Sequence, residues 1–357
     1  MASHAAKERE EIFDMIKVNE ALKIILDSVD AQPSETIKLA ESLSRVVSED
    51  ISSDVDIPLL DNSAMDGYAV KASDTTRSTQ NNPSALKVVE DLRAGYLASR
   101  EIHEKEAIRI MTGAPIPDGA YSVVMFEFTE KDGKDAVKIF KEVTRGENVR
   151  RSGEDIKNGE LVIKKGTLLN SAHIGIAASL GKSSLKVARR PRVAVLATGD
   201  EVIDVNEKLA PGKLRNSNTY TLCSQVLKSG GIPKNLGIAK DEPDLLESKI
   251  REGFDCDIIL TSGGVSVGDY DLVKHILAKT GTDIKFWKVA MRPGKPLVFG
   301  KIFTPSGKGI PIFGLPGNPV SSMVSFEVFV RPTIIKMLGQ ERDSRKELDA
   351  VLEEDIK

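Results

Sequence analysis

The chain has 357 residues, 40% of them hydrophobic and 29% charged, and its 50 Lys and Arg against 53 Asp and Glu leave a formal net charge of −3. This length corresponds to two or three domains, and the apolar share is large enough to bury their cores, which excludes a chain that is disordered throughout. The near-neutral charge argues against a basic face for duplex DNA or a membrane surface, so we expect neither nucleic acid nor membrane as a partner.

Helical periodicity is strongest near the N-terminus. Apolar residues recur at near-helical intervals from Glu11 to Val29, which predicts one or two amphipathic helices, and a further helix is predicted from Glu35 to Val47. A third is predicted from Ser171 to Leu180, with Ser171 as its N-cap and Gly181 just past its end. Between Asp54 and Arg151, short apolar stretches broken by Gly, Pro and Asp predict an irregular β-rich unit instead.

Strand and helix patterns alternate after Pro191. The predicted strands Val193–Leu196, Leu236–Ile238 and Ile258–Leu260 are followed in turn by the predicted helices Asn218–Leu227, Pro243–Arg251 and Asp271–Lys279. This order predicts a parallel sheet with a ligand crevice at the carboxyl ends of its strands. Later strands are predicted near Phe286–Met291, Leu297–Phe303 and Pro311–Phe313, and a final helix from Asn318 and Pro319 toward Met337.

Two cysteines and four isolated histidines support neither a disulfide framework nor a zinc site. The charged N-terminus holds no apolar secretion core, and no run approaches the length that spans a bilayer, so we expect a cytoplasmic protein. Residues 264–268 match the G-x-S-x-G of serine hydrolases, but the only later histidine, His275, is on the helix that directly follows. A turn or phosphate-binding role for these glycines is favoured, and a hydrolase that uses Ser266 stays an alternative.

Charged residues follow several of the predicted strands. Acidic loops are expected to share one edge of the sheet, with Asp200 and Glu201 after the first strand, Asp241 after the second, and Asp269 and Asp271 after the third. Crowded carboxylates repel one another unless a cation or a basic neighbour compensates them, and oxygen ligands favour Mg²⁺ completed by phosphate and water. Taken singly, each of these residues is more often a helix cap or a solvated charge.

Basic residues and a glycine turn are predicted near the same edge. Lys288, Arg292 and Lys295 alternate with apolar residues, and 314–319 (GLPGNP) leads into a helix N-terminus that favours anions. Together the two sets predict an anion or metal crevice.

Seven motifs in order resemble one family. They are DNSAMDGYA (61–69), RIMTGAPIPDGA (109–120), NVRRSGEDI (148–156), VAVLATGDE (193–201), TSGGVSVGDYD (261–271), FWKVAMRPGKP (286–296) and GLPGNPVS (314–321). The chain from about Val18 to Leu338 resembles MoeA, the molybdopterin molybdenumtransferase family, which includes gephyrin E domains. Alone, the first three motifs would be taken for tight turns with Asp caps.

The resemblance implies a multidomain α/β fold. It comprises a discontinuous helical and linking domain (11–53 and 152–188), a β-rich domain (54–151) and a MogA-like α/β domain (189–338), with 339–357 as a tail or the start of a truncated fourth domain. It implies a homodimer with the active cleft between the α/β domain of one subunit and the β-rich domain of the other. We also expect the small C-terminal β domain of the family to be missing.

The implied reaction inserts molybdate into adenylylated molybdopterin and releases AMP and molybdenum cofactor with Mg²⁺, and the implied further partner is a MogA-type adenylyltransferase. The catalytic residues carried over are Asp66, Thr112, Asp155, Glu201, Asp241, Asp271, Lys288 and Lys295, of which Glu201, Asp241 and Asp271 would hold the metal. The cofactor-binding residues carried over are Gly263, Gly264, Ser266, Arg292, Pro316, Gly317 and Asn318. A non-catalytic, gephyrin-like scaffold or peptide-binding module is the alternative.

Two substitutions depart from the family pattern. Arg292 stands where a lysine is usual, which exchanges a compact donor for a planar fork. Asn216 replaces the usual aspartate, so one carboxylate on the metal side is missing.

Overall fold

The computed structural model describes residues 15–264, 281–340, 349–351 and 353, and the chain divides into two compact units. The α/β unit holds residues 1–49 and 164–357, and the β-rich unit holds residues 50–163. The finer division into four domains stays a prediction. Within the described residues, no helix combines the length and the apolar character needed to cross a lipid bilayer.

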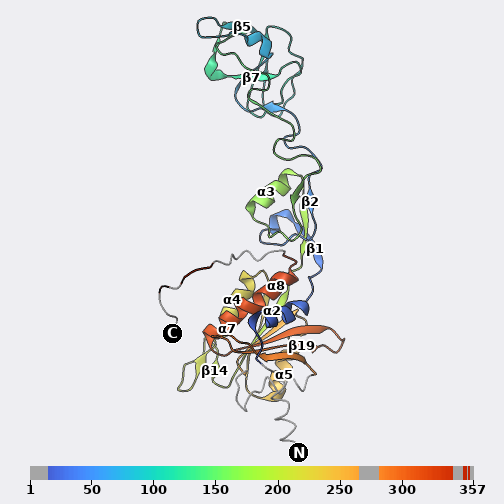
Figure 1. Cartoon of the computed structure of the whole chain (residues 1–357), viewed down its shortest axis with the longest axis vertical. Coiled ribbons are helices and arrows are strands. Elements are labelled where there is room, and N and C mark those ends of the chain that lie inside the picture. Colours follow the sequence, from blue (N-terminus) through green and yellow to red (C-terminus); the bar gives the residue numbers. More distant parts are fainter. Residues whose placement is uncertain (1–14, 265–280, 341–348, 352, 354–357) are drawn as a thin grey trace, which may run out of the picture. The chain divides into compact units, whose positions relative to one another are not determined.

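A six-stranded sheet forms the centre of the α/β unit (Figure 1). In spatial order its strands are β16 (Ile232–Ala239), β13 (Arg192–Thr198), β17 (Ile258–Ser262), β20 (Gly309–Leu315), β19 (Pro296–Phe303) and β18 (Asp283–Lys288). The first four are parallel, whereas β19 is antiparallel to both of its neighbours. The prediction of a parallel sheet is therefore wrong for its last part, where short turns connect β18, β19 and β20 and leave no room for the crossovers that parallel pairing requires.

Helices pack on both faces of this sheet. One face carries α2 (Val18–Asp27), α4 (Asn218–Lys228), α7 (Pro319–Ser325), the π-helical η4 (Phe326–Val330) and α8 (Arg331–Met337), and the other carries α5 (Pro243–Arg251). Strand side chains alternate between faces, so Val193 and Val195 of β13 join the first core while Ala194 and Leu196 join the second. The predicted helix Asp271–Lys279 lies outside the described residues.

The N-terminal segment differs from the predicted pair of helices. Helix α2 begins at Val18, because Ile16 is extended and pairs with Val289 in an isolated parallel bridge. The predicted helix from Glu35 to Val47 is wrong. Strand β1 (Ser34–Lys38) pairs there with β12 (Ser184–Ala188), and the short 3-10 turn η1 (Leu39–Glu41) follows. Pairing with a segment distant in the chain overrides the local helical pattern.

Helix α3 (Ser171–Ser179) confirms the third predicted helix but not its cap. The N-cap is Asn170, whose side-chain oxygen accepts the His173 N–H at 3.0 Å, while His173 Nδ1 accepts the Asn170 N–H at 3.2 Å. Gly181 follows the helix at a φ of +71°, as the sequence predicts. The pattern did not reveal the small parallel pair β14 (Val202–Ile203) and β15 (Leu214–Arg215).

The β-rich unit contains a second six-stranded sheet. In spatial order its strands are β7 (Ser122–Met125), β4 (Gly67–Val70), β6 (Glu106–Ile110), β5 (Ser84–Leu92), β9 (Ala136–Ile139) and β8 (Thr129–Lys131). Shorter elements are the pairs β2 (Ile51–Ser52) with β11 (Leu161–Ile163) and β3 (Asn62–Ser63) with β10 (Val149–Arg150), and the 3-10 turns η2 (Ala72–Thr75) and η3 (Phe126–Phe128). Neighbouring Tyr68 and Ala69 of β4 pack into separate cores. This arrangement confirms the predicted irregular β-rich unit.

Candidate active site

The carboxyl edge of the α/β sheet is a topological switch point. From β13 the chain crosses through α4 to β16 on one side, and from there through α5 to β17 on the other side of β13. Helices leaving in opposite directions open a crevice between such strands, and ligands of open α/β sheets bind there. The predicted acidic loops after β13 and β16, and the glycine turn after β17, all begin at this edge.

Glycines allow the backbone segments at this edge to approach one another closely. Gly263 has a φ of +100°, and a Cβ on it would lie 2.6 Å from the carbonyl oxygen of Thr198. A Cβ on Gly317 would be 3.6 Å from the Gly263 Cα. The turns after β13, β17 and β20 therefore approach one another through bare backbone, which leaves peptide groups accessible to a ligand.

The Asn218 side chain links the end of β17 to the turn after β20. Its Nδ2 donates to Ser262 Oγ and to the Gly317 carbonyl, each at 2.8 Å. Sequence reasoning placed this asparagine at the start of α4 but missed its role. Its place in the polar run 215–218 could have suggested such a role, because short amides commonly bond to backbone near helix starts.

Carboxylates gather at the β13–β16 end of the edge. The Asp241 N–H donates to Asp200 Oδ1 at 3.3 Å, and a Cβ added to Gly199 would lie 2.5 Å from the Glu201 carboxylate. Burial raises the pKa of Asp241, and the charges of Asp200 and Glu201 raise it further. The structure brings these three acids together, and their repulsion is the property that a bound cation would relieve.

Asn216, where the family resemblance predicts an aspartate, has a structural role. Its side-chain oxygen accepts the Thr219 N–H at 3.1 Å and so satisfies a free donor in the first turn of α4. The side chain is buried. An aspartate could accept the same bond, so the substitution removes charge but keeps this contact.

The predicted cations lie at the other end of the same edge. Lys288 ends β18, and Lys295 immediately precedes β19, whose first residue pairs with Lys288. The Val289 N–H donates to the Lys295 carbonyl at 3.0 Å and closes the loop that carries Arg292. Arg292 and Lys295 are exposed, Lys288 is partly exposed, and none of the three has an ion pair with another described residue.

The acids and the cations do not form one compact clamp. Three strand spacings separate β13 from β19, roughly 14 Å at about 4.8 Å each, and five separate β16, which precedes Asp241, from β18, which ends at Lys288, roughly 24 Å. The edge therefore suits an extended ligand that carries negative charge at one end and a metal at the other.

Three of the remaining predicted residues of this unit lie in the turns at the same edge. Asn318 caps α7 by accepting the Ser321 N–H at 3.0 Å, and Gly264 has a φ of +64°. Pro316 joins β20 to the Gly317 turn. Ser266 and Asp271 lie outside the described residues. No three His, Cys, Asp or Glu side chains among the residues described converge on a ready-made metal site.

In the β-rich unit, the predicted residues Asp66 and Thr112 are in direct contact. Asp66 Oδ1 accepts both the backbone N–H and the hydroxyl of Thr112, each at 2.8 Å. The bond from the Thr112 backbone lowers the pKa of Asp66 most, and the hydroxyl adds to it. Asp66 is thus a fixed carboxylate that stays ionised.

The third β-rich loop joins the first through one hydrogen bond and one ion pair to Asp61. Ser152 N–H donates to Asp61 Oδ1 at 2.8 Å, and Arg151 binds Asp61 Oδ2 at 2.6 Å. Asp155 pairs with Arg150 at 2.5 Å, and Arg150 stands opposite Asn62 in the β3–β10 ladder. All three motif loops of this unit therefore meet, whereas their catalytic roles stay predictions.

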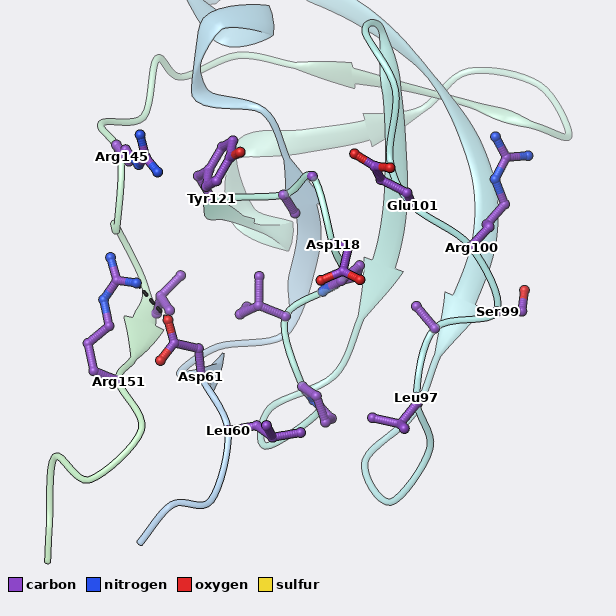
Figure 2. Close-up of a pocket in the computed structure, with 17 residues that line it drawn as sticks. Leu60, Asp61, Leu97, Ser99, Arg100, Glu101, Asp118, Tyr121, Arg145 and Arg151 are labelled. Atoms are coloured by element: carbon purple, nitrogen blue, oxygen red, sulfur yellow. Dashed lines mark hydrogen bonds and ion pairs between the residues drawn. The ribbon is translucent and has the colours of Figure 1, made fainter. Parts of the chain in front are cut away.

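A cavity of about 710 Å³ adjoins these loops (Figure 2). Asp61 and Arg151 border it on one side, and Glu101 and Asp118 on the other. The Arg145 guanidinium lies 4.2 Å from the centre of the Tyr121 ring at its wall. Both charged and apolar side chains line this cavity, and its volume lies in the range of small-molecule sites.

Comparison with known proteins accounts for both units. Residues 16–181 match the family model of the MoeA N-terminal region (domains I and II), and residues 194–336 match that of a probable molybdopterin-binding domain. Crystal structures of the molybdopterin biosynthesis protein MoeA from Pyrococcus horikoshii share 32% identity, with TM-scores of 0.80 and 0.78. They cover 92% of this chain, which covers 81% and 80% of theirs.

Sequence relatives agree. A molybdopterin molybdenumtransferase of Bacillus subtilis is 37% identical over 96% of this chain and 79% of its own length. Molybdopterin molybdenumtransferase 2 of Mycobacterium tuberculosis is 39% identical over 95% of this chain and 84% of its own length. The chain therefore belongs to the molybdopterin molybdenumtransferases, the MoeA family of enzymes in molybdenum cofactor biosynthesis.

Proposed function

We propose that the chain inserts molybdate into adenylylated molybdopterin, with Mg²⁺-dependent release of AMP, to give molybdenum cofactor. The observation that carries the proposal is the carboxyl edge of the α/β sheet. Mutually repelling carboxylates occupy one end, cations without ion-pair partners among the described residues occupy the other, and glycine-rich backbone lies between them.

The cationic end suits the oxyanions of this reaction. Molybdate and the phosphates of the substrate are anions, and Lys288, Arg292 and Lys295 supply charge and N–H donors that no described carboxylate already uses. Donors that are held in place before the substrate arrives stabilise charge that develops during the reaction. Lys288 and Lys295 are well placed for this because the β18–β19 pairing fixes their backbone.

The acidic end fits Mg²⁺. Asp200, Glu201 and Asp241 offer oxygen donors only, and their mutual repulsion favours a divalent cation. Mg²⁺ commonly takes one or two protein carboxylates and completes its shell with phosphate and water, so a ready-made cluster is not required. When bound, the ion would polarise the phosphoanhydride and neutralise the departing adenylate.

The β-rich loops complete the proposal. We place Asp66, Thr112 and Asp155 in the active cleft of a homodimer, where the α/β edge of one subunit faces the β-rich loops of its partner. The ionised Asp66 is held rigidly by Thr112, as a group that positions substrate must be. A MogA-type adenylyltransferase would supply the adenylylated substrate.

The test is a reaction of the purified chain with adenylylated molybdopterin, molybdate and Mg²⁺, followed by chromatography for AMP and by reconstitution of a molybdenum-dependent apoenzyme. Lys288→Gln should lower the rate about a hundredfold, as loss of one preorganised donor does. Lys23→Gln is the matched control, because Lys23 is exposed on α2 and its substitution removes the same charge. A folded chain that releases no AMP would instead support the scaffold alternative.

A further inference from the structure

A second cavity lies at the opposite edge of the α/β sheet. It encloses about 380 Å³ between the C-terminal end of α4, helix α8 and the loop at 43–45. Arg190 lines it just before β13, and Gly230 lines it just before β16, so the cavity adjoins the amino ends of these strands. The seven residues of β13 at about 3.3 Å each put roughly 23 Å between it and the carboxyl edge.

Positive charge dominates its wall. Arg45, Arg190, Lys228 and Arg331 all line the cavity, and no aspartate or glutamate among the described residues does so. Arg45 already pairs with Glu35 and Arg331 with Glu327, whereas Arg190 and Lys228 have no ion pair with another described residue, so an anion in the cavity would compensate them. That imbalance distinguishes it from the cavity of the β-rich unit, where acids and bases alternate.

Arg190 is held in position without a counterion. Its Nε donates to the Gly230 carbonyl at 2.8 Å and its Nη2 to the Gly231 carbonyl at 2.7 Å. No carboxylate among the described residues pairs with it. Burial lowers the pKa of Arg190, and the nearby charge of Arg45 lowers it further, as expected for a cation that lacks an anionic neighbour.

Arg45 has an unused donor. Its Nη2 binds the Ala188 carbonyl at 2.8 Å and also pairs with Glu35, but its Nε is buried with no acceptor among the described residues. Only 13% of the side chain is exposed. A buried N–H without a partner is costly, and an anion in the cavity would supply the missing acceptor.

The rim of the cavity is apolar. Leu43, Leu168 and Leu227 line it with 57%, 41% and 55% of their surfaces exposed. Lys228, exposed in the last turn of α4, completes the rim and has no ion pair with another described residue. A ligand that fits both parts carries a compact anion and an apolar body.

We propose that this cavity binds a small organic phosphate monoester. The phosphate lies among Arg45, Arg190 and Lys228, and the organic part packs on the leucine rim. The volume of the cavity falls in the range of small-molecule sites. The cavity is separate from the proposed catalytic edge, so its occupant does not compete with substrate for that edge.

Calorimetric titration of the full-length protein with phenyl phosphate tests this, with inorganic phosphate and phenol as comparison ligands. We expect one site per chain that binds phenyl phosphate more tightly than inorganic phosphate, does not bind phenol, and weakens with added salt. Lys228→Gln should weaken binding up to about fivefold, as loss of an exposed ion pair does. Arg190→Gln should weaken it about tenfold or more, as loss of a charged hydrogen-bond partner does.

Two further variants keep the test decisive. Lys87→Gln, on an exposed strand position of the β-rich unit, removes the same charge and should bind like the parent. Lys288→Gln should also bind like the parent, because it alters only the catalytic edge. Binding lost in Lys288→Gln but kept in Lys228→Gln would overturn the proposal, as would no binding at about 10 mM, where a site with a Kd of 1 mM would be filled.

Discussion

The tight turn at Gly263 offers a quantitative test of the site geometry. A Gly263→Ala side chain would meet the Thr198 carbonyl oxygen at 2.6 Å and the Thr198 hydroxyl at 2.9 Å, while its backbone keeps a φ of +100°. The backbone strain costs about 1–3 kcal/mol. The steric conflict adds about 1–3 kcal/mol, because a paired strand end cannot move aside freely. We therefore expect a loss of roughly 2–6 kcal/mol in the free energy of unfolding of the α/β unit.

Gly281→Ala is the matched control. Gly281 also has a positive φ, of +71°, but nothing lies within 4 Å of its Cβ position, so it should lose only the backbone part, about 1–2 kcal/mol. Urea unfolding can be followed by the fluorescence of Trp287, the single tryptophan, which lies in β18 of the α/β unit. Equal losses in the two variants would refute the close approach between the turns after β13 and β17.

Three further predictions concern individual contacts. Asn218→Ala removes the link between two turns of the carboxyl edge, so unfolding free energy should fall by about 1–2 kcal/mol and AMP release should slow; an unchanged rate would contradict the link's role. Thr112→Val removes one of the two bonds that lower the pKa of Asp66, so that pKa should rise while staying below its ordinary value, which carboxyl-carbon NMR titration would show. The pKa of Asp61 is also lowered, chiefly by the Ser152 N–H, so its stabilising effect is complete above pH 3.8 and is lost as the pH falls through the lower folded pKa. Asp61→Asn should therefore be less stable than the parent at pH 7 in urea, and a gap that persists undiminished at pH 3 would contradict this account.

Local sequence patterns predicted several α/β elements well, because an amphipathic helix or a buried strand can be recognised within a short window of sequence. Residues 243–251 form a helix with the predicted ends, since Pro243 supplies a good first-turn residue and Leu246 and Ile250 fall on one buried face. The carboxyl edge could be predicted for the same reason: strand ends and the turns after them are local features of βαβ units.

Features set by long-range pairing escaped prediction. The segment at 34–38 has a helical pattern, but hydrogen bonding to β12 makes it a strand. Antiparallel β19 depends on turn geometry, which hydrophobic patterns do not encode. Asn218 was missed because its two acceptors, Ser262 at the end of β17 and the Gly317 carbonyl, belong to segments far from it in the chain.

The spacing of the charges could not be predicted either. The sequence places acids and bases at strand ends, but only the strand order shows that roughly 14 Å separates β13 from β19. The same strand order explains why none of the described acids of this edge forms an ion pair with Lys288, Arg292 or Lys295.

In the proposed reaction, the two charged ends of the carboxyl edge act on one substrate. The most direct measurement is the rate of AMP release from adenylylated molybdopterin, at saturating molybdate and Mg²⁺, by the parent chain, Asp241→Asn and Lys288→Gln. We predict release by the parent and a loss of about two orders of magnitude in each folded variant. Release that is undiminished in either variant would contradict the claim, because that end of the edge would then have no part in the reaction.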